Sequence, residues 1–286
     1  MITYDPHKWF DHFFDVRGSL VKEISGRVLA CVLWSAVVVF VDKNYVSVHI
    51  SSVLHTLVGL ALSMLLVFRT NASYDRFWEG RKLWGGIVNE SRNLIRSAYI
   101  HLGTERNLLL QLTRLTVDFS VASMHQLRGE KVPGMAGAQH APFVVATRMT
   151  VVLKEAHKRQ AISDIVLVSL DQNIQLLVDY IGGCERIRTT PVPFAYVIHL
   201  RRALVAYCFS LPFALVDSFG WGTIFDTLIV SYIFFGIEEI GVEIEGPFGS
   251  DDNDLPLETI CETIRHNLFA IVGIEQAAPD IMPEGL

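Results

Sequence analysis

The stretch from Ile50 to Phe68 constrains this chain more than any other segment, because its 19 residues include no Lys, Arg, Asp or Glu. A helix needs about 20 apolar residues to cross the hydrocarbon core of a bilayer. The whole chain is 51% hydrophobic and 19% charged, whereas ordinary soluble domains are about 25% charged. We therefore predict an integral membrane protein in which this stretch crosses the bilayer.

Three weaker apolar segments predict further spans. In the first, Arg27 and Lys43 flank the apolar run and are long enough to extend toward the lipid headgroups. The two others lie in the C-terminal third. On hydropathy alone, the three weaker segments could also be buried helices of a soluble core. The four expected spans are residues 25–43, 50–70, 195–216 and 218–240.

The distribution of positive charge sets the expected orientation. The first 27 residues contain four Lys or Arg, whereas the loop from Asp42 to His49 contains one. Because Lys and Arg concentrate on the cytoplasmic side of a membrane, both termini are expected in the cytoplasm. Residues 71–193 should then form a cytoplasmic helical region, and residues 241–286 a cytoplasmic tail.

Apolar residues recur at helical spacing between Phe77 and Arg128, which predicts long helices there. A loop rich in Gly and Pro follows. Two more helices are predicted, from Phe143 to His157 and from Ile162 to Ile181, the second ended by Gly182 and Gly183. The expected fold class is an all-α membrane protein with four transmembrane helices and long cytoplasmic helices, in a single domain of residues 1–286.

Net charge and missing motifs argue against several classes of function. A formal net charge of -6 argues against a nucleic-acid partner, which needs a clustered basic surface. The sequence lacks the motifs G-x-x-x-x-G-K-[ST], H-E-x-x-H and G-x-S-x-G, so we expect no enzymatic activity and no catalytic residues. The cysteines form no C-x-x-C pair and are expected to be reduced and mostly buried. They are Cys31, Cys184, Cys208 and Cys261.

Three sequence blocks resemble bacterial members of the bestrophin family, in the family's order and at compatible separations. They are FRTNASYDRFWEGRKLWG from Phe68, GCERIRTTPVPFAY ending at Tyr196, and EGPFGSDDNDLPLETIC from Glu245 to Cys261. The resemblance extends over about residues 5 to 270. It implies a homopentamer in the bacterial inner membrane, with four spans per subunit around a central ion pore and a wider cytoplasmic vestibule.

On the second span, Leu60, Met64 and Phe68 recur every four residues and so share one helix face. The resemblance places them at the family's hydrophobic neck; from the spacing alone, packing against lipid or a neighbouring helix is the ordinary explanation. An apolar neck acts as a barrier or dewetting gate and does not select the sign of charge. The small residue Gly59 is expected to allow close helix packing.

By the same resemblance, Val168 falls at a second, cytoplasmic constriction, with a core valine as the alternative. The nearby Asp171, Gln172 and Gln175 fit either the lining of a vestibule or an ordinary solvated helix face.

An acidic segment in the tail suggests a cation site. Asp251 and Asp254 match carboxylates of the calcium clasp of animal bestrophins, and backbone carbonyls near Glu243 and Gly246 would complete it. Bacterial relatives commonly dilute this cluster, as Asn253 does here. Calcium is therefore an optional cofactor, and none is required.

Charged residues also lie in and beside the last span. Glu238, Glu239, Glu243 and Glu245 are expected to form a solvated acidic face, with focusing of cations at an inner mouth as the alternative. Asp226 lies within the span, where a carboxylate is costly unless it is paired or near an interface.

The expected function is passive conduction of small monovalent ions, with a lean toward sodium or potassium that rests on the bacterial resemblance and the net acidity. Chloride conduction, as in animal relatives, is the alternative. A secondary transporter, for which Pro212 in the third span is a weak hint, and a membrane-anchored scaffold are two other classes. His49 and His55 are six residues apart and do not share a helix face, so no metal is expected there.

Overall fold

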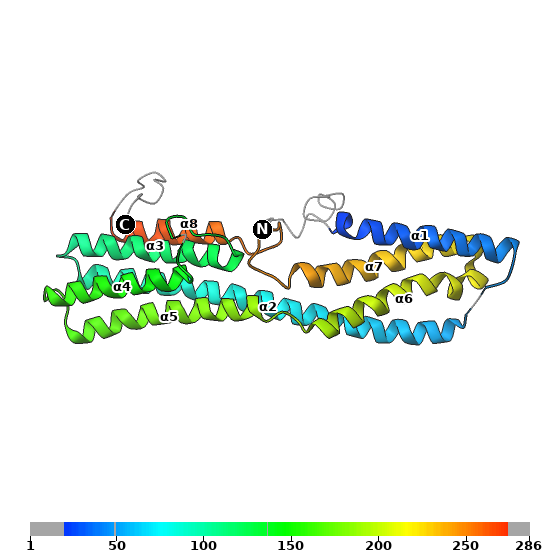
Figure 1. Cartoon of the computed structure of the whole chain (residues 1–286), viewed down its shortest axis with the longest axis horizontal. Helices are drawn as coiled ribbons and strands as arrows, with labels where there is room; N and C mark the ends of the chain where they lie inside the picture. The colour runs from blue at the N-terminus through cyan, green and yellow to red at the C-terminus, as the bar shows by residue number, and fades with distance from the viewer. Residues whose placement is uncertain (1–19, 49, 136, 274–286) are drawn as a thin grey trace. The chain divides into compact units, whose positions relative to one another are not determined.

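The computed structural model describes residues 20–273 except 49 and 136, and within these residues the secondary structure is helical (Figure 1). The chain divides into two compact units, which we call unit 1 (Met1–Phe77 and Pro191–Gly246) and unit 2 (Trp78–Thr190 and Pro247–Leu286). The helices are α1 (Val21–Asn44), α2 (Ser52–His101), α3 (Arg106–Arg128), α4 (Ala141–Lys158), α5 (Asp164–Thr189), α6 (Phe194–Phe219), the 3-10 helix η1 (Gly220–Gly222), α7 (Thr223–Glu243) and α8 (Leu257–Ile271).

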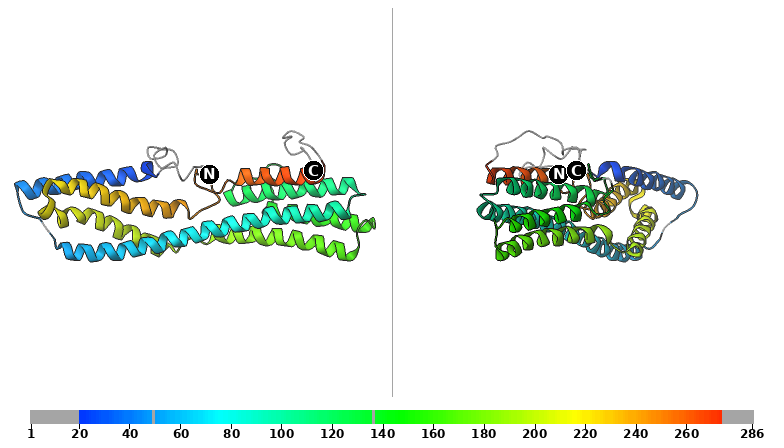
Figure 2. Two further views of the ribbon diagram at one scale, coloured as in Figure 1. Left: turned by 180° about the vertical axis from the view of Figure 1, so that it is seen from behind. Right: turned by 60° about the vertical axis from the view of Figure 1, so that its left-hand side comes forward.

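Unit 1 contains α1, the first half of α2, α6 and α7. Helix α1 packs against α6 and α7, which also pack against each other, as the views in Figures 1 and 2 agree. All four helices contribute side chains to one apolar core. Contacts between these apolar side chains stabilise the cluster. Its buried members are Ile24, Val28, Cys31, Leu62, Leu66, Leu200, Leu204, Cys208 and Phe235.

Within the described part of the chain, three helical stretches are long and apolar enough to cross a membrane: Val21–Asn44, Ser52–His101 and Phe194–Glu243. The third holds both α6 and α7, joined by η1. Gly220 opens that turn with φ of 53°, a left-handed conformation in which a residue without Cβ avoids a steric penalty. Because α6 and α7 contact each other, the stretch is a helical hairpin. The prediction of an all-helical fold is confirmed within the described residues.

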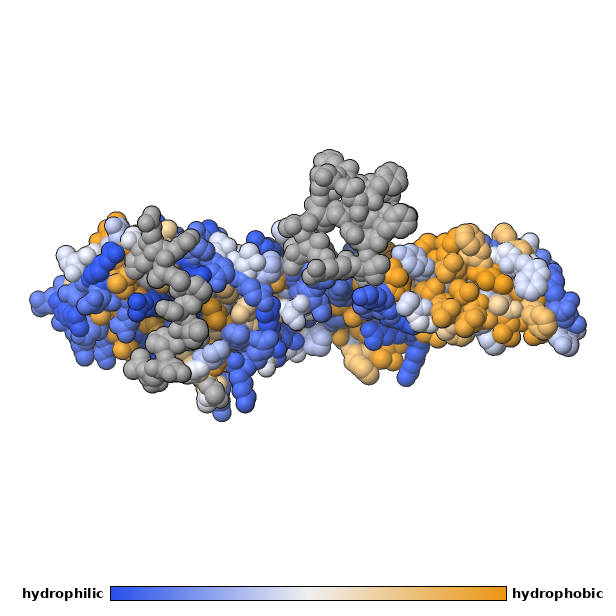
Figure 3. Space-filling view, turned by 90° about the horizontal axis from the view of Figure 1, so that it is seen from above, coloured by the Kyte–Doolittle hydropathy of each residue, from blue (hydrophilic) through white to orange (hydrophobic). Residues whose placement is uncertain are grey.

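The outer surface of unit 1 is rich in apolar side chains, which appear as the orange region of Figure 3. On α1 alone, Leu29, Leu33, Val37 and Phe40 are each at least half exposed. Exposed apolar area of this extent is rare on a soluble monomer, and it fits a helix surface solvated by lipid. Asp226 lies in the first turn of α7, where the positive end of the helix dipole favours a carboxylate.

Unit 2 is a bundle in which α3 packs against α4, α5 and α8, and α4 packs against α5. Its helices bury one apolar face each, as the helical spacing predicted. On α3 the buried face includes Leu109, Leu112 and Phe119, which are fully inaccessible to solvent. The predicted helix from Phe143 to His157 lies within α4.

The predicted end of the helix from Ile162 to Ile181 is wrong, because α5 continues through Gly182 and Gly183 to Thr189. A Cβ atom on Gly183 would lie 2.9 Å from the Cδ2 atom of Leu83 on α2. The glycine therefore permits close approach of two helices in unit 2, a tertiary role that overrides its weak helix propensity. The prediction for the cysteines is confirmed: all four are free thiols and buried.

Candidate pore-lining helix

Helix α2 has two different faces within unit 1. Leu60, Met64 and Phe68 are 64%, 56% and 60% exposed, whereas Leu62 and Leu66 are almost completely buried in the core of the unit. Side chains four residues apart project on the same side of a helix. The structure therefore places the three predicted neck residues in one exposed apolar row, backed by a helix face that is fixed in the protein.

Two contacts near the N-terminal end of α2 fix it against α6. A Cβ atom on Gly59 would lie 2.6 Å from the hydroxyl of Tyr207, so only glycine fits without displacing that ring. One turn earlier, His55 stacks on Tyr207, and its Nε2 lies 3.2 Å from both the Tyr207 carbonyl oxygen and the Ser210 hydroxyl. His55 thus packs between helices. The other histidine considered with it, His49, lies outside the described residues.

A buried cation follows directly after the exposed row. Arg69 is 1% exposed, and its guanidinium donates hydrogen bonds to the Ser73 hydroxyl at 3.1 Å and to the Glu245 carboxylate at 2.7 Å. A charge removed from solvent in this way is costly unless it is paired. The pair has no local signal in the sequence, because its members lie 176 positions apart.

Glu245 connects three parts of unit 1. One carboxylate oxygen accepts from Arg69, the other accepts the Val192 backbone N–H at 2.8 Å, and its carbonyl accepts from Arg76 Nε at 3.1 Å. Burial by itself raises the pKa of Glu245, but the Val192 N–H, Arg69 and Arg76 together outweigh it and hold the pKa below its usual value. The carboxylate is therefore ionised at neutral pH.

The remaining carboxylates near the end of α7 are paired rather than freely solvated. Glu238 is 1% exposed and accepts hydrogen bonds from Arg27 at 3.4 Å and from Arg201 at 2.8 Å. Glu239 also pairs with Arg27. The expectation of a solvated acidic face is therefore wrong for Glu238, Glu239 and Glu245, which join helices α1, α2, α6 and α7.

The second predicted constriction lies in unit 2. Val168 is 57% exposed on α5, so it is not the core valine that was the alternative. Gln172 and Gln175 are also exposed, and Asp171 accepts hydrogen bonds from Thr150 and Gln175. These contacts are compatible with either a vestibule lining or a solvated helix face.

The acidic tail forms a closed turn. The Asp254 carboxylate accepts the Asp251 N–H at 2.9 Å, and the Asp254 N–H donates to the Asp251 carbonyl at 3.0 Å. Within residues 20–273, apart from 49 and 136, no group of three or more His, Cys, Asp or Glu side chains is gathered as a metal site. Glu243 and Gly246 belong to unit 1 and the two aspartates to unit 2, so the calcium clasp stays a prediction.

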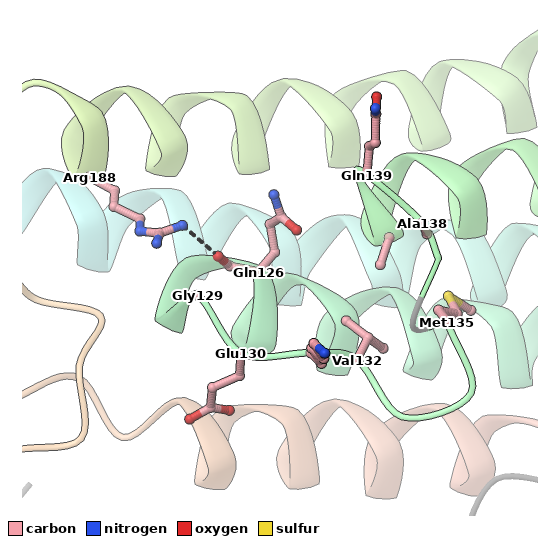
Figure 4. Close-up of a pocket in the computed structure, with 10 residues that line it drawn as sticks. Gln126, Gly129, Glu130, Val132, Met135, Ala138, Gln139 and Arg188 are labelled. Atoms are coloured by element: carbon pink, nitrogen blue, oxygen red, sulfur yellow. Dashed lines mark hydrogen bonds between the residues drawn. The ribbon is translucent and has the colours of Figure 1, made fainter.

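A cavity of about 230 Å³ opens in unit 2 where α3 ends (Figure 4). Gln126, Glu130 and Arg188 are among the residues that line it. The Arg188 guanidinium donates a hydrogen bond of 2.7 Å to the Gln126 carbonyl oxygen, and so it braces the C-terminal turn of α3. The cavity is lined by other residues than the exposed row on α2.

Helical stretches long and apolar enough to cross a membrane, an exposed apolar row on one of them and a second helical unit define an all-helical membrane protein. The sequence matches the family described as bacterial/fungal bestrophin protein over residues 1–270. The chain belongs to this family.

Relatives and solved structures agree with this assignment. The chain is 39% identical to a voltage-dependent anion channel-forming protein of Nostoc sp., covering 96% of this chain and 94% of the relative. It is 37% identical to a protein of the same description from Synechocystis sp., with 94% and 93% covered. A crystal structure of a bacterial bestrophin homolog from Klebsiella pneumoniae superposes with a TM-score of 0.84 at 32% identity, covering 88% of this chain and all of the other.

Proposed function

We propose that this protein is an ion channel that conducts small monovalent ions passively through a homopentameric pore lined by α2. The observation that carries the proposal is the exposed row of Leu60, Met64 and Phe68, whose side chains lie outside the core of their own unit. Membership of a family with channel-forming relatives supports a pore as the place where that row is used.

The mechanism follows from the chemistry of the row. Five copies around a symmetry axis would stack three apolar rings, and such a constriction passes ions only when it is hydrated. It offers neither formal charge nor hydrogen-bond donors, so it sets a barrier without selecting the sign of charge. Charge selectivity must then arise elsewhere along the pathway. Val168 is our candidate for a second constriction, and as an apolar residue it also sets a barrier without selecting the sign of charge.

The relatives favour anions over the cation preference that we expected. Those of Nostoc sp. and Synechocystis sp. are both named anion channel-forming proteins. In addition, three of the four carboxylates considered for cation focusing are ion-paired with arginines, which reduces the negative field that they project. We therefore propose chloride-like anions as the conducted species, with sodium or potassium as the alternative.

The proposed topology has four spans per subunit in the bacterial inner membrane, with α6 and α7 crossing separately. Arg27 near the start of α1 and Arg201 near the start of α6 both contact Glu238 near the end of α7. These helix ends therefore lie together, and the arginines favour the cytoplasmic side for them. Both termini are accordingly proposed to be cytoplasmic.

Recordings from purified protein in planar bilayers test the channel directly. Met64→Ala and Phe68→Ala should each raise the unitary conductance, because a smaller side chain widens an apolar constriction. Leu33→Ala is the matched control, since Leu33 is equally exposed and apolar but lies on α1. The reversal potential in a sodium chloride gradient assigns the charge sign.

Three outcomes separate the alternatives. The absence of unitary currents under all voltages and ionic conditions would leave the membrane-anchored scaffold. Substrate-coupled flux without unitary currents would indicate a secondary transporter. Unchanged conductance in both α2 variants would remove the exposed row from the pore. Calcium binding at Asp251 and Asp254 remains a separate proposal, which thermal unfolding with and without a chelator checks.

A further inference from the structure

We infer that the ion pair between Arg69 and Glu245 positions Phe68, and thereby sets the width of the cytoplasmic end of the neck. The inference rests on the proposed pore function of α2. It concerns two residues outside the exposed row: Arg69 lies on a different face of α2 from Phe68, and Glu245 follows α7.

Phe68 and Arg69 are neighbours on α2 but lie on different faces of the helix. Successive side chains are rotated by about 100° around a helix axis, so Phe68 and Arg69 point in different directions. Phe68 is 60% exposed and Arg69 is 1% exposed. A rotation of α2 that moves Arg69 toward solvent therefore also changes the direction in which Phe68 points.

The hydrogen bonds of Arg69 restrain the rotation of α2 about its axis. Its guanidinium contacts the Ser73 hydroxyl on the same helix and the Glu245 carboxylate outside it. Among the residues that the structure describes, Glu245 is the acidic residue within ion-pairing distance of Arg69. Because a planar guanidinium forms hydrogen bonds only in fixed directions, the pair restrains the rotation of α2 as well as its distance from the partner.

Two further contacts fix the position of Glu245. The Val192 N–H binds its second carboxylate oxygen, and Arg76, about two helical turns beyond Arg69 on α2, binds its carbonyl. Val192 lies just before α6 and Glu245 just after α7. The position of Phe68 therefore depends on contacts with the ends of α6 and α7, and not only on packing along α2.

A purely structural ion pair would have the same distances, so the test must separate neck geometry from stability. Glu245→Gln keeps an oxygen that can accept the Val192 N–H but removes the charge that faces Arg69. The double variant Arg69→Gln with Glu245→Gln removes both charges and leaves no unpaired buried cation. Glu258→Gln is the matched control, because it breaks a pair with Arg128 in unit 2.

Unitary conductance and the melting temperature in detergent are measured for all variants. Glu245→Gln should change the conductance by about twofold, since small changes in an apolar constriction strongly alter its hydration, and should lower the melting temperature. The double variant should recover most of the melting temperature but not the wild-type conductance. Glu258→Gln should leave the conductance unchanged.

Recovery of both quantities in the double variant, or wild-type conductance in Glu245→Gln, would overturn the inference. If Glu245→Gln does not fold, Arg69→Lys keeps the charge without the planar group, and wild-type conductance in that variant would overturn the inference equally. A wild-type protein without currents would instead refute the channel itself. Altered currents in the Arg69 and Glu245 variants combined with unaltered currents in Phe68→Ala would refute the neck assignment.

Discussion

Unit 1 and unit 2 are both built from helices, but unit 1 exposes many more large apolar side chains than unit 2. In unit 1, Leu29, Leu33 and Phe40 are exposed while Arg69 and Glu238 are buried. In unit 2, the α3 residues Leu109 and Leu112 are buried, and many charged side chains lie at the surface. Figure 3 shows the same contrast as orange and blue surface.

The difference matches the contrast between helices in lipid and helices in water. In water, a helix is held by burying an apolar stripe, so its sequence must be amphipathic. In lipid, apolar side chains gain little by leaving the surface, and helices associate through close packing and polar contacts. The ion pairs of the buried Glu238 with the partly exposed Arg27 and Arg201, and the buried hydrogen bond between Thr227 and Ser35, are contacts of that kind.

The largest expected effect tests where apolar side chains matter. Leu109→Ala in the core of unit 2 should lower the free energy of unfolding by about 2–5 kcal/mol, because it leaves a cavity. Leu33→Ala on the exposed face of α1 should change it by less than about 0.5 kcal/mol. Denaturant titration in detergent micelles measures both. Similar losses for the two variants would show that Leu33 is covered by protein.

The second prediction concerns charge. Glu238→Ala should cost about 1.5–3 kcal/mol, the usual loss of hydrogen bonds to a charged group, since Arg27 and Arg201 remain partly exposed. Glu262→Ala, which breaks an exposed pair with Arg265 in unit 2, should cost less than about 0.5 kcal/mol. Equal losses in the free energy of unfolding for the two variants would show that the ion pairs of Glu238 stabilise unit 1 no more than an exposed pair stabilises unit 2.

The smallest effect is a pH dependence of opposite sign in the two units. The pKa of Glu245 is lowered on folding, so its stabilising contribution is present above its ordinary pKa near 4.5 and is lost as pH falls through the lower folded value. Burial raises the pKa of Asp118 in unit 2, against the opposing effect of Arg148 and Arg114. Protonation of Asp118 as pH falls therefore favours folding.

Melting temperatures measured across the acid range check these two signs. Glu245→Gln should weaken the loss of stability on acidification. Asp118→Asn should steepen it, because the opposing contribution is gone. The same acid response in both variants as in the wild type would mean that neither carboxyl changes its pKa on folding.

The predicted elements that succeeded depend on local sequence. The apolar run after Ile50 lies almost entirely within α2, and the helical spacing between Phe77 and Arg128 corresponds to the rest of α2 and to α3. The prediction failed at Gly183, where contact with Leu83 decides the backbone, and at Glu238, where arginines from two other helices supply partners. Neither contact has a local signature.

By itself, the sequence determined that this chain enters a membrane, that its middle region is helical and that three blocks resemble bestrophins, because hydropathy, helical period and motif order are properties of neighbouring residues. Only the tertiary structure decided which face of α2 is exposed and which charge holds it. Arg69 and Glu245 meet across 176 positions, and burial of the guanidinium makes that meeting necessary. The row of Leu60, Met64 and Phe68 thus depends on a contact that lies outside the row itself.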